Sequence, residues 1–500
     1  MSGASKDRKG AVAAVSGGTN GRSGNGGAAW RVVAVVSALA ALFAVKEALS
    51  FLRPPPVAHA AAQPSPAHAR LPVYDEATTR AASAVGRRLF FDASLSEPAG
   101  TSCASCHDPA RAFAGNHGSD RGVPRGSRPD HFARRNTPSL LYLKFVHRFH
   151  FHWEEDAALP DAFGGFFWDG RSDSIAALAE QPLTNPDEMN AGSRADVAAK
   201  LNAAAYAGEL RRVYGSDALA TPDRAMVTFG RAIEAFLKSD EFAPFSSRYD
   251  DFIRGKGTLS AVEQRGMQLF RDPAKGNCGS CHRFNPTTAD SARSLFTDFG
   301  YETVAIPRNP HISKNNDKDY FDLGLCERHD PRTHTDEERF CGSFRTPSLR
   351  NVAVRDAYMH NGYFTKLRDV VAFYATRSIT PARWYPGKKW DDLPTQYHEY
   401  VNQIAPPYDR GPGEKPRLDD GEIDAIVAFL GTLTDAAYAP AAALPTGARV
   451  VPSGGEPPPA PAEVESPPAV VPTPRRDPSQ PPNVRHDLRS LANQPQFQTQ

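Results

Sequence analysis

The sequence predicts a mainly helical protein built from two related domains, and three observations support this prediction. A five-residue motif of cysteine and histidine occurs twice, at residues 103–107 and 278–282. Landmarks around the first motif recur in the same order around the second. Several segments repeat apolar residues with helical spacing, whereas no segment sustains the alternation typical of a strand. Stretches rich in Gly, Pro, Asn and Asp separate the helices, so we also expect long loops.

Both motifs read Cys-x-Ser-Cys-His, which contains the attachment signature of a c-type haem. In that signature the two thiols form thioethers to the porphyrin, and the histidine binds the iron. The expected attachment residues are Cys103, Cys106 and His107 for one haem, and Cys278, Cys281 and His282 for the other. A lone Cys-x-x-Cys also serves zinc and redox sites, but two identical pentads favour two covalently bound haem c groups.

An internal repeat appears when the two motifs are aligned. Each is preceded by Gly-x-x-Leu-Phe-x-Asp and followed by Thr-Pro-Ser-Leu and then by an aromatic or imidazole residue, a polar residue and Gly. These landmarks lie at residues 86–92 and 266–272, 137–140 and 346–349, and 168–170 and 360–362. We therefore expect two haem domains related by internal duplication, one over residues 72–255 and one over residues 256–438.

Helical periodicity and capping signals locate the main helices. Residues 75–91 and 223–237 are amphipathic, and Ser260 with Glu263 forms a capping box before another amphipathic segment. Residues 419–433 predict a terminal helix with Ile423, Ile426, Val427 and Leu430 turned inward.

The two ends of the chain do not resemble folded domains. Residues 1–71 contain an apolar run from Val32 to Val45, which suits a signal h-region better than a membrane span. Small-x-small cleavage sites follow at 58–60 and 60–62, and a retained anchor in the inner membrane is the alternative. We expect export to the periplasm, as a soluble protein or a tethered one. Residues 439–500 form a Pro-rich tail that we expect to be disordered.

Composition adds two expectations. The net charge of +1 over 500 residues gives no argument for a nucleic-acid partner, so none is expected. Cys326 and Cys341 lie outside the haem motifs, and an oxidising compartment favours a disulfide between them. Two unpaired thiols are the alternative.

Over residues 72–437 the chain resembles the bacterial di-haem cytochrome c peroxidase and MauG superfamily, nearer to the MauG branch. The similar motifs, besides Cys-x-Ser-Cys-His, are Arg-Asn-Thr-Pro-Ser-Leu at 135–140, Trp-Asp-Gly-Arg at 168–171 and Phe-Arg-Thr-Pro-Ser-Leu-Arg-Asn-Val at 344–352. The resemblance implies two mainly helical, cytochrome-c-like domains with a calcium ion between them. It also implies that the N-terminal haem reacts with peroxide, while the C-terminal haem relays electrons or stores an oxidising equivalent.

The axial ligand of the C-terminal haem separates the branches of this superfamily. The peroxidase branch has a methionine about fourteen residues after the His-x-Gly landmark, where this chain has Tyr374. The resemblance to the MauG branch implies Tyr374 as the ligand, and Met359 is the alternative. A phenolate favours ferric iron and lowers the reduction potential, which suits a haem that reaches high oxidation states.

The resemblance also assigns residues around the N-terminal haem. The position of the usual distal histidine is Val123, which implies an open face for peroxide, with His117 as an alternative ligand and His131 further along. The distal proline falls at Pro182 and the distal acid at Glu188, which would move a proton between the peroxide oxygens. The usual glutamine partner falls at Leu178, and Gln181 could replace it.

Further assignments concern the region between the haems. Trp168 resembles the inter-haem tryptophan of the family. Calcium ligation is implied for the Asn136 side chain and for the carbonyls of Arg355 and Ala357. His360 resembles a landmark near the second haem and is not expected to bind iron. The segment from His147 to Trp153 alternates imidazole and aromatic groups, and a strand or loop insertion is favoured over a metal site or a partner surface.

These assignments predict an exported di-haem oxidase that uses hydrogen peroxide at the N-terminal haem. Glu188, Trp168 and Pro182 would form its catalytic surroundings, and oxidation would pass to a protein substrate or a redox donor. One alternative is a peroxidase that detoxifies hydrogen peroxide with a soluble cytochrome c donor. The other is a non-catalytic electron-transfer cytochrome, which predicts two six-coordinate haems.

Overall fold

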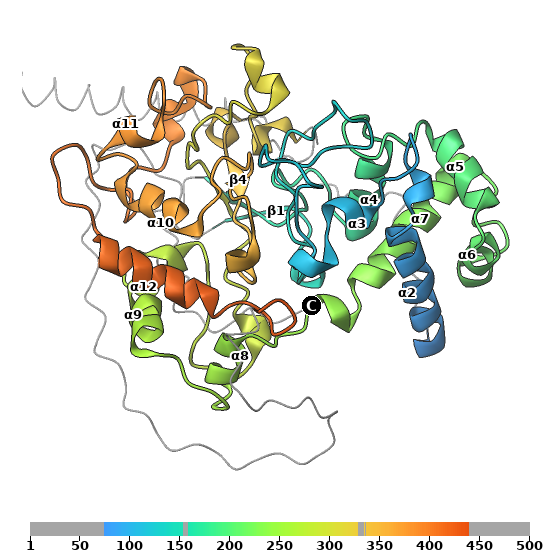
Figure 1. Ribbon diagram of the computed structural model, residues 1–500, viewed down its shortest axis with the longest axis horizontal. Coiled ribbons are helices and arrows are strands. Elements are labelled where there is room, and N and C mark those ends of the chain that lie inside the picture. Colours follow the sequence, from blue (N-terminus) through green and yellow to red (C-terminus); the bar gives the residue numbers. More distant parts are fainter. Residues whose placement is uncertain (1–74, 154–158, 329–334, 336, 440–500) are drawn as a thin grey trace, which may run out of the picture. The chain divides into compact units, whose positions relative to one another are not determined.

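Two pairs of packed helices organise the part of the chain that the computed structural model describes, residues 75–153, 159–328, 335 and 337–439. In the first pair α2, Glu76–Phe90, packs on α7, Pro222–Leu237. In the second pair α9, Ala261–Arg271, packs on α12, Asp420–Gly431 (Figure 1). The leader predicted for residues 1–71 and most of the predicted tail lie outside the described residues.

Capping explains where these helices begin. The side chain of Asp75 accepts a hydrogen bond from the Thr78 amide at 2.7 Å and starts α2. The predicted capping box of Ser260 and Glu263 is present at the start of α9. A second box, formed by Asp419 and Glu422, starts α12. Each box satisfies amide groups that a helix leaves unpaired at its N-terminus. The four predicted helices are thus confirmed to within a few residues.

Shorter elements complete the two helical layers. α4 packs on α7, and α10 packs on α12. The remaining helices and the helices just named have these bounds: α3 Cys103–Cys106, α4 Ile175–Thr184, α5 Arg194–Ala203, α6 Ala207–Tyr214, α8 Arg248–Ile253, α10 Leu367–Thr376 and α11 Pro381–Trp384. Short 3-10 turns and long loops connect them. The fold is therefore mainly helical, as predicted.

The strands of the described region form two small antiparallel sheets of two strands each. β1, His150–His152, pairs with β2, Asp161–Phe163, and β3, Tyr301–Glu302, pairs with β4, Phe344–Arg345. β1 is the centre of the segment that alternates histidine and aromatic residues. His150 stacks on Phe163 of the partner strand with ring centroids 6.0 Å apart. This agrees with the strand interpretation of that segment.

A glycine allows the close approach of each helix pair. A Cβ atom at Gly86 of α2 would lie 1.9 Å from the Ala232 carbonyl oxygen of α7. A Cβ atom at Gly266 of α9 would lie 1.9 Å from the Ala425 carbonyl oxygen of α12. Both glycines belong to the repeated Gly-x-x-Leu-Phe-x-Asp landmark. The landmark thus has the same packing role in both halves.

The substitution Gly266→Ala is expected to lower the free energy of unfolding by about 2–3 kcal/mol, because backbone atoms of α12 would have to move. Gly208→Ala is the matched control, since Gly208 lies in α6 and a Cβ there meets no atom within 4 Å. The control is expected to change the free energy by less than about 1 kcal/mol. Chemical unfolding of the haem-loaded protein measures both, and equal effects would contradict the close-packing argument.

Two large hydrophobic cores accompany the helix pairs. The buried residues of one core come from the range 85–242, and those of the other come from 249–433. All described residues belong to one compact unit of the chain. Within the described residues, no helix is both long and apolar enough to cross a membrane.

Candidate functional site

The first haem motif lies on α3, a single helical turn at Cys103–Cys106 that is followed directly by His107. The Nδ1 atom of His107 lies 3.0 Å from the carbonyl oxygen of Phe113, to which it donates a hydrogen bond. Burial lowers the pKa of His107 to about 4. The imidazole therefore stays neutral at physiological pH, with Nε2 available to an iron ion.

The second haem motif repeats this arrangement. Its cysteines lie at and beside a 3-10 turn, Cys278–Ser280, and His282 follows. The Nδ1 atom of His282 lies 2.9 Å from the carbonyl oxygen of Phe296. Phe113 and Phe296 both adopt positive φ angles, 54° and 56°. Both histidines are thus oriented by a carbonyl that the same backbone turn presents, as is usual for histidines that bind metals.

The Thr-Pro-Ser-Leu landmarks hold these turns in place. The Ser139 hydroxyl donates to the carbonyl of Ala112 at 2.6 Å, one residue before Phe113. The Ser348 hydroxyl donates to the carbonyl of Leu295 at 2.6 Å, one residue before Phe296. The serine of each landmark therefore supports the turn that orients the histidine of its own half.

One cavity of the structure is bordered by the second motif, with Cys278, Cys281 and His282, and by Tyr374 of α10 and Trp168 of the first half. Burial raises the pKa of the Cys278 thiol to about 12, so this sulfur lies in surroundings that suit a neutral thioether. Apolar walls, two thiols and an oriented imidazole are what a covalent haem requires. The residues present fit haem c at this position.

The helices α4 and α10 occupy corresponding places in the two halves. Just before α4, the backbones of Phe166 and Ser172 pair in an isolated antiparallel β-bridge. Just before α10, the backbones of Tyr358 and Phe364 pair in the same way. Gly170 and Gly362 within these loops share a φ angle of 66°. Twelve residues after each glycine the chain has Pro182 in α4 and Tyr374 in α10. Proline has no side-chain atom that can bind iron, whereas tyrosine does, so the two positions differ in this one respect.

Both candidate ligands of the C-terminal haem lie at the same place. The Tyr374 hydroxyl is 3.8 Å from the Met359 sulfur, and both residues border the cavity. Burial raises the pKa of Tyr374 above its ordinary value. The phenol therefore stays protonated unless a bound cation such as ferric iron stabilises the phenolate. Arg377 is fully buried and its guanidinium stacks on the ring of Tyr408, which in turn packs against Tyr374.

Glu188 lies just after α4. Burial raises its pKa, and the nearby Arg171 guanidinium opposes this shift. The Arg171 Nε atom donates to the Gln181 side-chain oxygen at 2.8 Å, and the guanidinium stacks on Phe167 with its carbon 3.5 Å from the ring centre. Leu178, which has the position of the family's usual glutamine, is buried in the hydrophobic core of the first half. Arg171 thus links Gln181 to the surroundings of Glu188, a connection that spacing in the sequence did not indicate.

The histidines considered as distal ligands have partners of their own. The Nδ1 atom of His117 lies 2.8 Å from the Arg125 carbonyl oxygen. The Nδ1 atom of His131 lies 2.9 Å from a carboxylate oxygen of Asp187. Val123 is fully buried and has no side-chain atom that binds iron.

Asn136 connects Trp168 to the second half of the chain. Its carbonyl oxygen accepts a hydrogen bond from the Trp168 indole Nε1 at 2.8 Å. Its backbone amide donates to the His360 carbonyl oxygen at 2.8 Å. The His360 ring is buried against Phe344, with centroids 3.5 Å apart, and burial lowers its pKa to about 3. His360 therefore acts as a packed neutral ring.

A buried charge network that the sequence did not predict holds this connection. Arg135 forms an ion pair with Asp169, the neighbour of Trp168. It forms a second ion pair with Asp322, in which two guanidinium nitrogens lie 2.6 and 2.7 Å from the two carboxylate oxygens. Burial opposes the ionisation of both carboxyl groups, but the Arg135 charge outweighs it, and their pKa values are lowered. One partner lies 187 residues from Arg135 in sequence. The only early signal was the arginine in the Arg-Asn-Thr-Pro-Ser-Leu motif.

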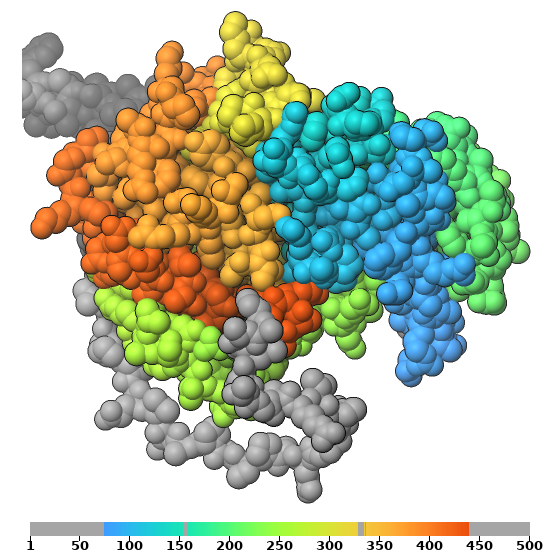
Figure 2. All heavy atoms as spheres, viewed as in Figure 1, coloured from blue at the N-terminus to red at the C-terminus, as the bar shows by residue number. Residues whose placement is uncertain are grey.

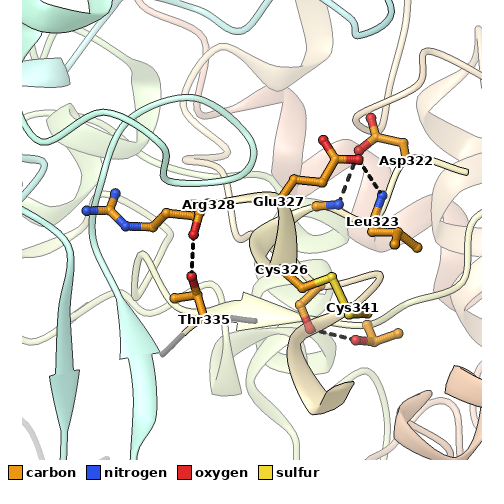
Figure 3. The surroundings of a disulfide bond; sticks show 10 residues. Asp322, Leu323, Cys326, Glu327, Arg328, Thr335 and Cys341 are labelled. Atoms are coloured by element: carbon orange, nitrogen blue, oxygen red, sulfur yellow. Dashed lines mark hydrogen bonds between the residues drawn. A yellow bond between two sulfur atoms is a disulfide. The ribbon is translucent and has the colours of Figure 1, made fainter. Parts of the chain in front are cut away.

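A disulfide joins Cys326 to Cys341 beside this network (Figure 3). The neighbouring Glu327 accepts a hydrogen bond from Arg134 at 2.6 Å, and the Thr335 hydroxyl donates to the Arg328 carbonyl oxygen at 2.7 Å. The disulfide therefore lies in the loop that carries carboxylate partners of the Arg134 and Arg135 side chains.

The oxygen atoms assigned to calcium are close together but already have partners. The Asn136 side-chain oxygen accepts from the Arg355 guanidinium at 3.1 Å. The Ala357 carbonyl oxygen accepts from the Asn136 side-chain nitrogen at 3.0 Å, and the Arg355 carbonyl oxygen accepts from the Tyr358 hydroxyl at 2.8 Å. A guanidinium within this set would repel a calcium ion. The residues present therefore do not fit calcium.

The two halves also meet through glycines. A Cβ atom at Gly122 would lie 2.1 Å from the Gly362 carbonyl oxygen, and one at Gly362 would lie 1.9 Å from the Gly122 carbonyl oxygen. On the face shown in Figure 2, cyan residues of the first half lie directly against orange residues of the second. Gly122 directly precedes Val123, in the loop that follows the first haem motif. This contact therefore connects that loop to the His360-Asn361-Gly362 landmark.

Comparison with known proteins shows the family to which the chain is similar. Residues 80–258 match the family model described as di-haem cytochrome c peroxidase. The methylamine utilization protein MauG of Paracoccus denitrificans is 36% identical over 369 residues, which cover 72% of this chain and 90% of that protein. The crystal structure of the diheme peroxidase BthA from Burkholderia thailandensis is 46% identical, covers 75% of this chain and 89% of that one, and has a TM-score of 0.69.

A variant of BthA in which a tyrosine is replaced by methionine matches with 47% identity and a TM-score of 0.70, over 74% of this chain and 88% of that one. Both the sequence relative and the solved structures are thus matched over most of their own length. The chain therefore belongs to the di-haem cytochrome c peroxidase family and is an oxidoreductase.

Proposed function

We propose that the protein is a MauG-type di-haem oxidase that uses hydrogen peroxide and passes the oxidation to a protein substrate or a redox-protein donor in the periplasm. The observation that carries this proposal is the difference between the two corresponding helices, Pro182 in α4 and Tyr374 in α10. With this difference, the N-terminal haem would receive no ligand from α4, and the C-terminal haem would receive an oxygen donor from α10. The bound haems supply the iron that reacts with peroxide and accepts or releases electrons.

Glu188 has the role of moving a proton between the two peroxide oxygens. Burial raises its pKa, so its affinity for a proton is closer to what a general acid and base needs near neutral pH. Arg171 limits this rise by its positive charge. The ring of Pro182 has no atom that could bind iron at this position of α4.

Trp168 has the role of carrying electrons between the halves. Its indole borders the cavity of the second motif, and its Nε1 hydrogen bond to Asn136 at 2.8 Å fixes the plane of the ring. Asn136 is itself tied to the His360 carbonyl oxygen and to the Met359 carbonyl oxygen. A rigid aromatic ring at this position shortens each electron transfer step between two haems.

Tyr374 would bind the iron of the C-terminal haem. Its side chain borders the same cavity as Cys278, Cys281 and His282, which indicates that it lies near the motif. An oxygen ligand favours the higher oxidation states of iron. Tyr374 would therefore let this half hold an oxidising equivalent.

The test is stopped-flow addition of one equivalent of hydrogen peroxide to the anaerobic diferric protein, and separately to protein reduced by one electron. We expect the diferric protein to react at once, with loss of ferric Soret absorption and a new near-infrared band that both haems share. A reaction that occurs only after one-electron reduction would contradict the proposal.

A second candidate is a peroxidase that detoxifies hydrogen peroxide with a cytochrome c donor. The contact of the Met359 sulfur with the Tyr374 hydroxyl favours it, because a small movement would exchange one ligand for the other. The relatives of this chain also include the cytochrome-c peroxidase IdrP2 of Denitromonas iodatirespirans. It is 28% identical over 305 residues, which cover 58% of this chain and 72% of that protein. The non-catalytic cytochrome is not proposed, since the relatives are enzymes.

A further inference from the structure

The guanidinium group of Arg355 lies where the two halves of the chain meet. One of its terminal nitrogens donates to the Asn136 side-chain oxygen at 3.1 Å and to the Thr137 carbonyl oxygen at 2.8 Å. Its Nε atom lies 3.3 Å from the Ala357 carbonyl oxygen. The group therefore joins oxygens of the first half to an oxygen of the second.

These acceptors are neutral oxygens, whereas Arg350 and Arg135 pair with carboxylates. Arg350 pairs with the carboxylate of Asp250 at 2.9 Å through two nitrogens, and Arg135 pairs with Asp322. The carboxylate next to Arg355, Asp356, forms its ion pair with Arg111 instead. Carbonyl and amide oxygens around a positive charge are also the surroundings that a hard cation selects.

Every oxygen of the assigned calcium set already accepts a hydrogen bond from the protein. The third one, the Arg355 carbonyl oxygen, accepts from the Tyr358 hydroxyl at 2.8 Å. Among the residues that the structure describes, no three or more His, Cys, Asp or Glu side chains gather as a metal site. The positive charge that a calcium ion would supply here comes from the Arg355 guanidinium, and hydrogen bonds to these oxygens take the place of coordination bonds.

We propose that the Arg355 guanidinium replaces calcium as the cation that joins the two halves, so that this protein folds and holds both haems without calcium. Arg355 is then a positioning residue: it fixes Asn136, whose carbonyl oxygen binds the Trp168 indole. The inference goes beyond the proposed function, because it concerns the junction and not the peroxide chemistry.

The test measures metal content and thermal stability of the purified diferric holoprotein, without peroxide, so its outcome is independent of the proposed function. The protein is equilibrated with calcium, desalted and analysed by inductively coupled plasma mass spectrometry, and its Tm is measured in calcium and in EGTA. We expect iron from two haems, no calcium and the same Tm in both buffers. One tightly held calcium ion per chain, or a Tm that falls in EGTA, would overturn the inference.

Two variants and a control extend the test. Arg355→Thr is expected to lower the Tm in EGTA by roughly 3–6 °C and to regain it when calcium is added. Arg355→Lys keeps the positive charge and is expected to stay free of calcium, which provides a result even if the threonine variant does not fold. Arg111→Thr is the control, since Arg111 is exposed and pairs with the neighbouring acids Asp108 and Asp356. An Arg355→Thr protein with unchanged Tm and no calcium response, or calcium in the lysine variant, would contradict the proposal.

Discussion

Replacing Tyr374 with phenylalanine is expected to abolish the near-infrared band that peroxide produces in the diferric protein. The phenylalanine ring keeps the apolar volume of the side chain in α10 but removes its single oxygen. Without that oxygen donor, the C-terminal half loses the ligand that favours high oxidation states of iron. Peroxide would then be consumed without a long-lived oxidised state shared between the two halves.

Tyr408→Phe is the matched control for this prediction. The ring of Tyr408 lies 5.5 Å from that of Tyr374 and also borders the cavity, so it has similar surroundings without the same role. The control is expected to keep the band. Haem content is measured for each variant, so that a loss of haem is not mistaken for a loss of ligand. A Tyr374→Phe protein with full haem content and an undiminished band would show that another residue is the ligand.

Replacing Glu188 with glutamine is expected to slow the reaction with peroxide by about 10²–10⁴-fold, the usual contribution of general acid-base catalysis. Glutamine keeps the size of the side chain but cannot accept or release the proton. The pH profile should change as well. Burial raises the pKa of Glu188, and the ionised form is the proton acceptor, so the wild-type rate should rise with pH through a midpoint above the ordinary glutamate value.

The neighbouring carboxylate provides the control for Glu188. Asp187 binds His131 at 2.9 Å, so Asp187→Asn removes an acid of the same loop that has a different partner. Stopped-flow rates for the wild type and both variants, measured across pH, give the comparison. A loss of less than about tenfold in Glu188→Gln, or an unchanged acid limb in its pH profile, would assign proton transfer to another group.

Local signals in the sequence predicted the parts of the fold that depend on neighbours in the chain. The helices begin close to where the sequence predicted, and the predicted capping box of Ser260 and Glu263 is present. Asp75 and Asp419 also cap their helices, because a capping side chain acts on amides two or three residues away. The sequence also shows that Gly86 and Gly266 have the same position in the repeated landmark. What this glycine does, which is to admit a carbonyl of the partner helix, becomes visible only in the packed structure.

Contacts between distant loops could not be predicted in the same way. Arg135 and Asp322 lie in segments without regular secondary structure, and no periodicity relates them. The calcium assignment rested on carbonyl oxygens at Arg355 and Ala357, and a carbonyl carries no side-chain signal. The arginine at that position was visible in the sequence, but its effect depends on where the guanidinium points.

We expect that Tyr374, and not Met359, would hold the iron of the C-terminal haem together with His282. Near-infrared magnetic circular dichroism of the resting diferric protein tests it most directly, because ferric haems with phenolate and with thioether ligands give different charge-transfer bands. We predict a phenolate-type spectrum for one haem that disappears in Tyr374→Phe. A histidine–methionine spectrum that disappears in Met359→Leu would contradict the account.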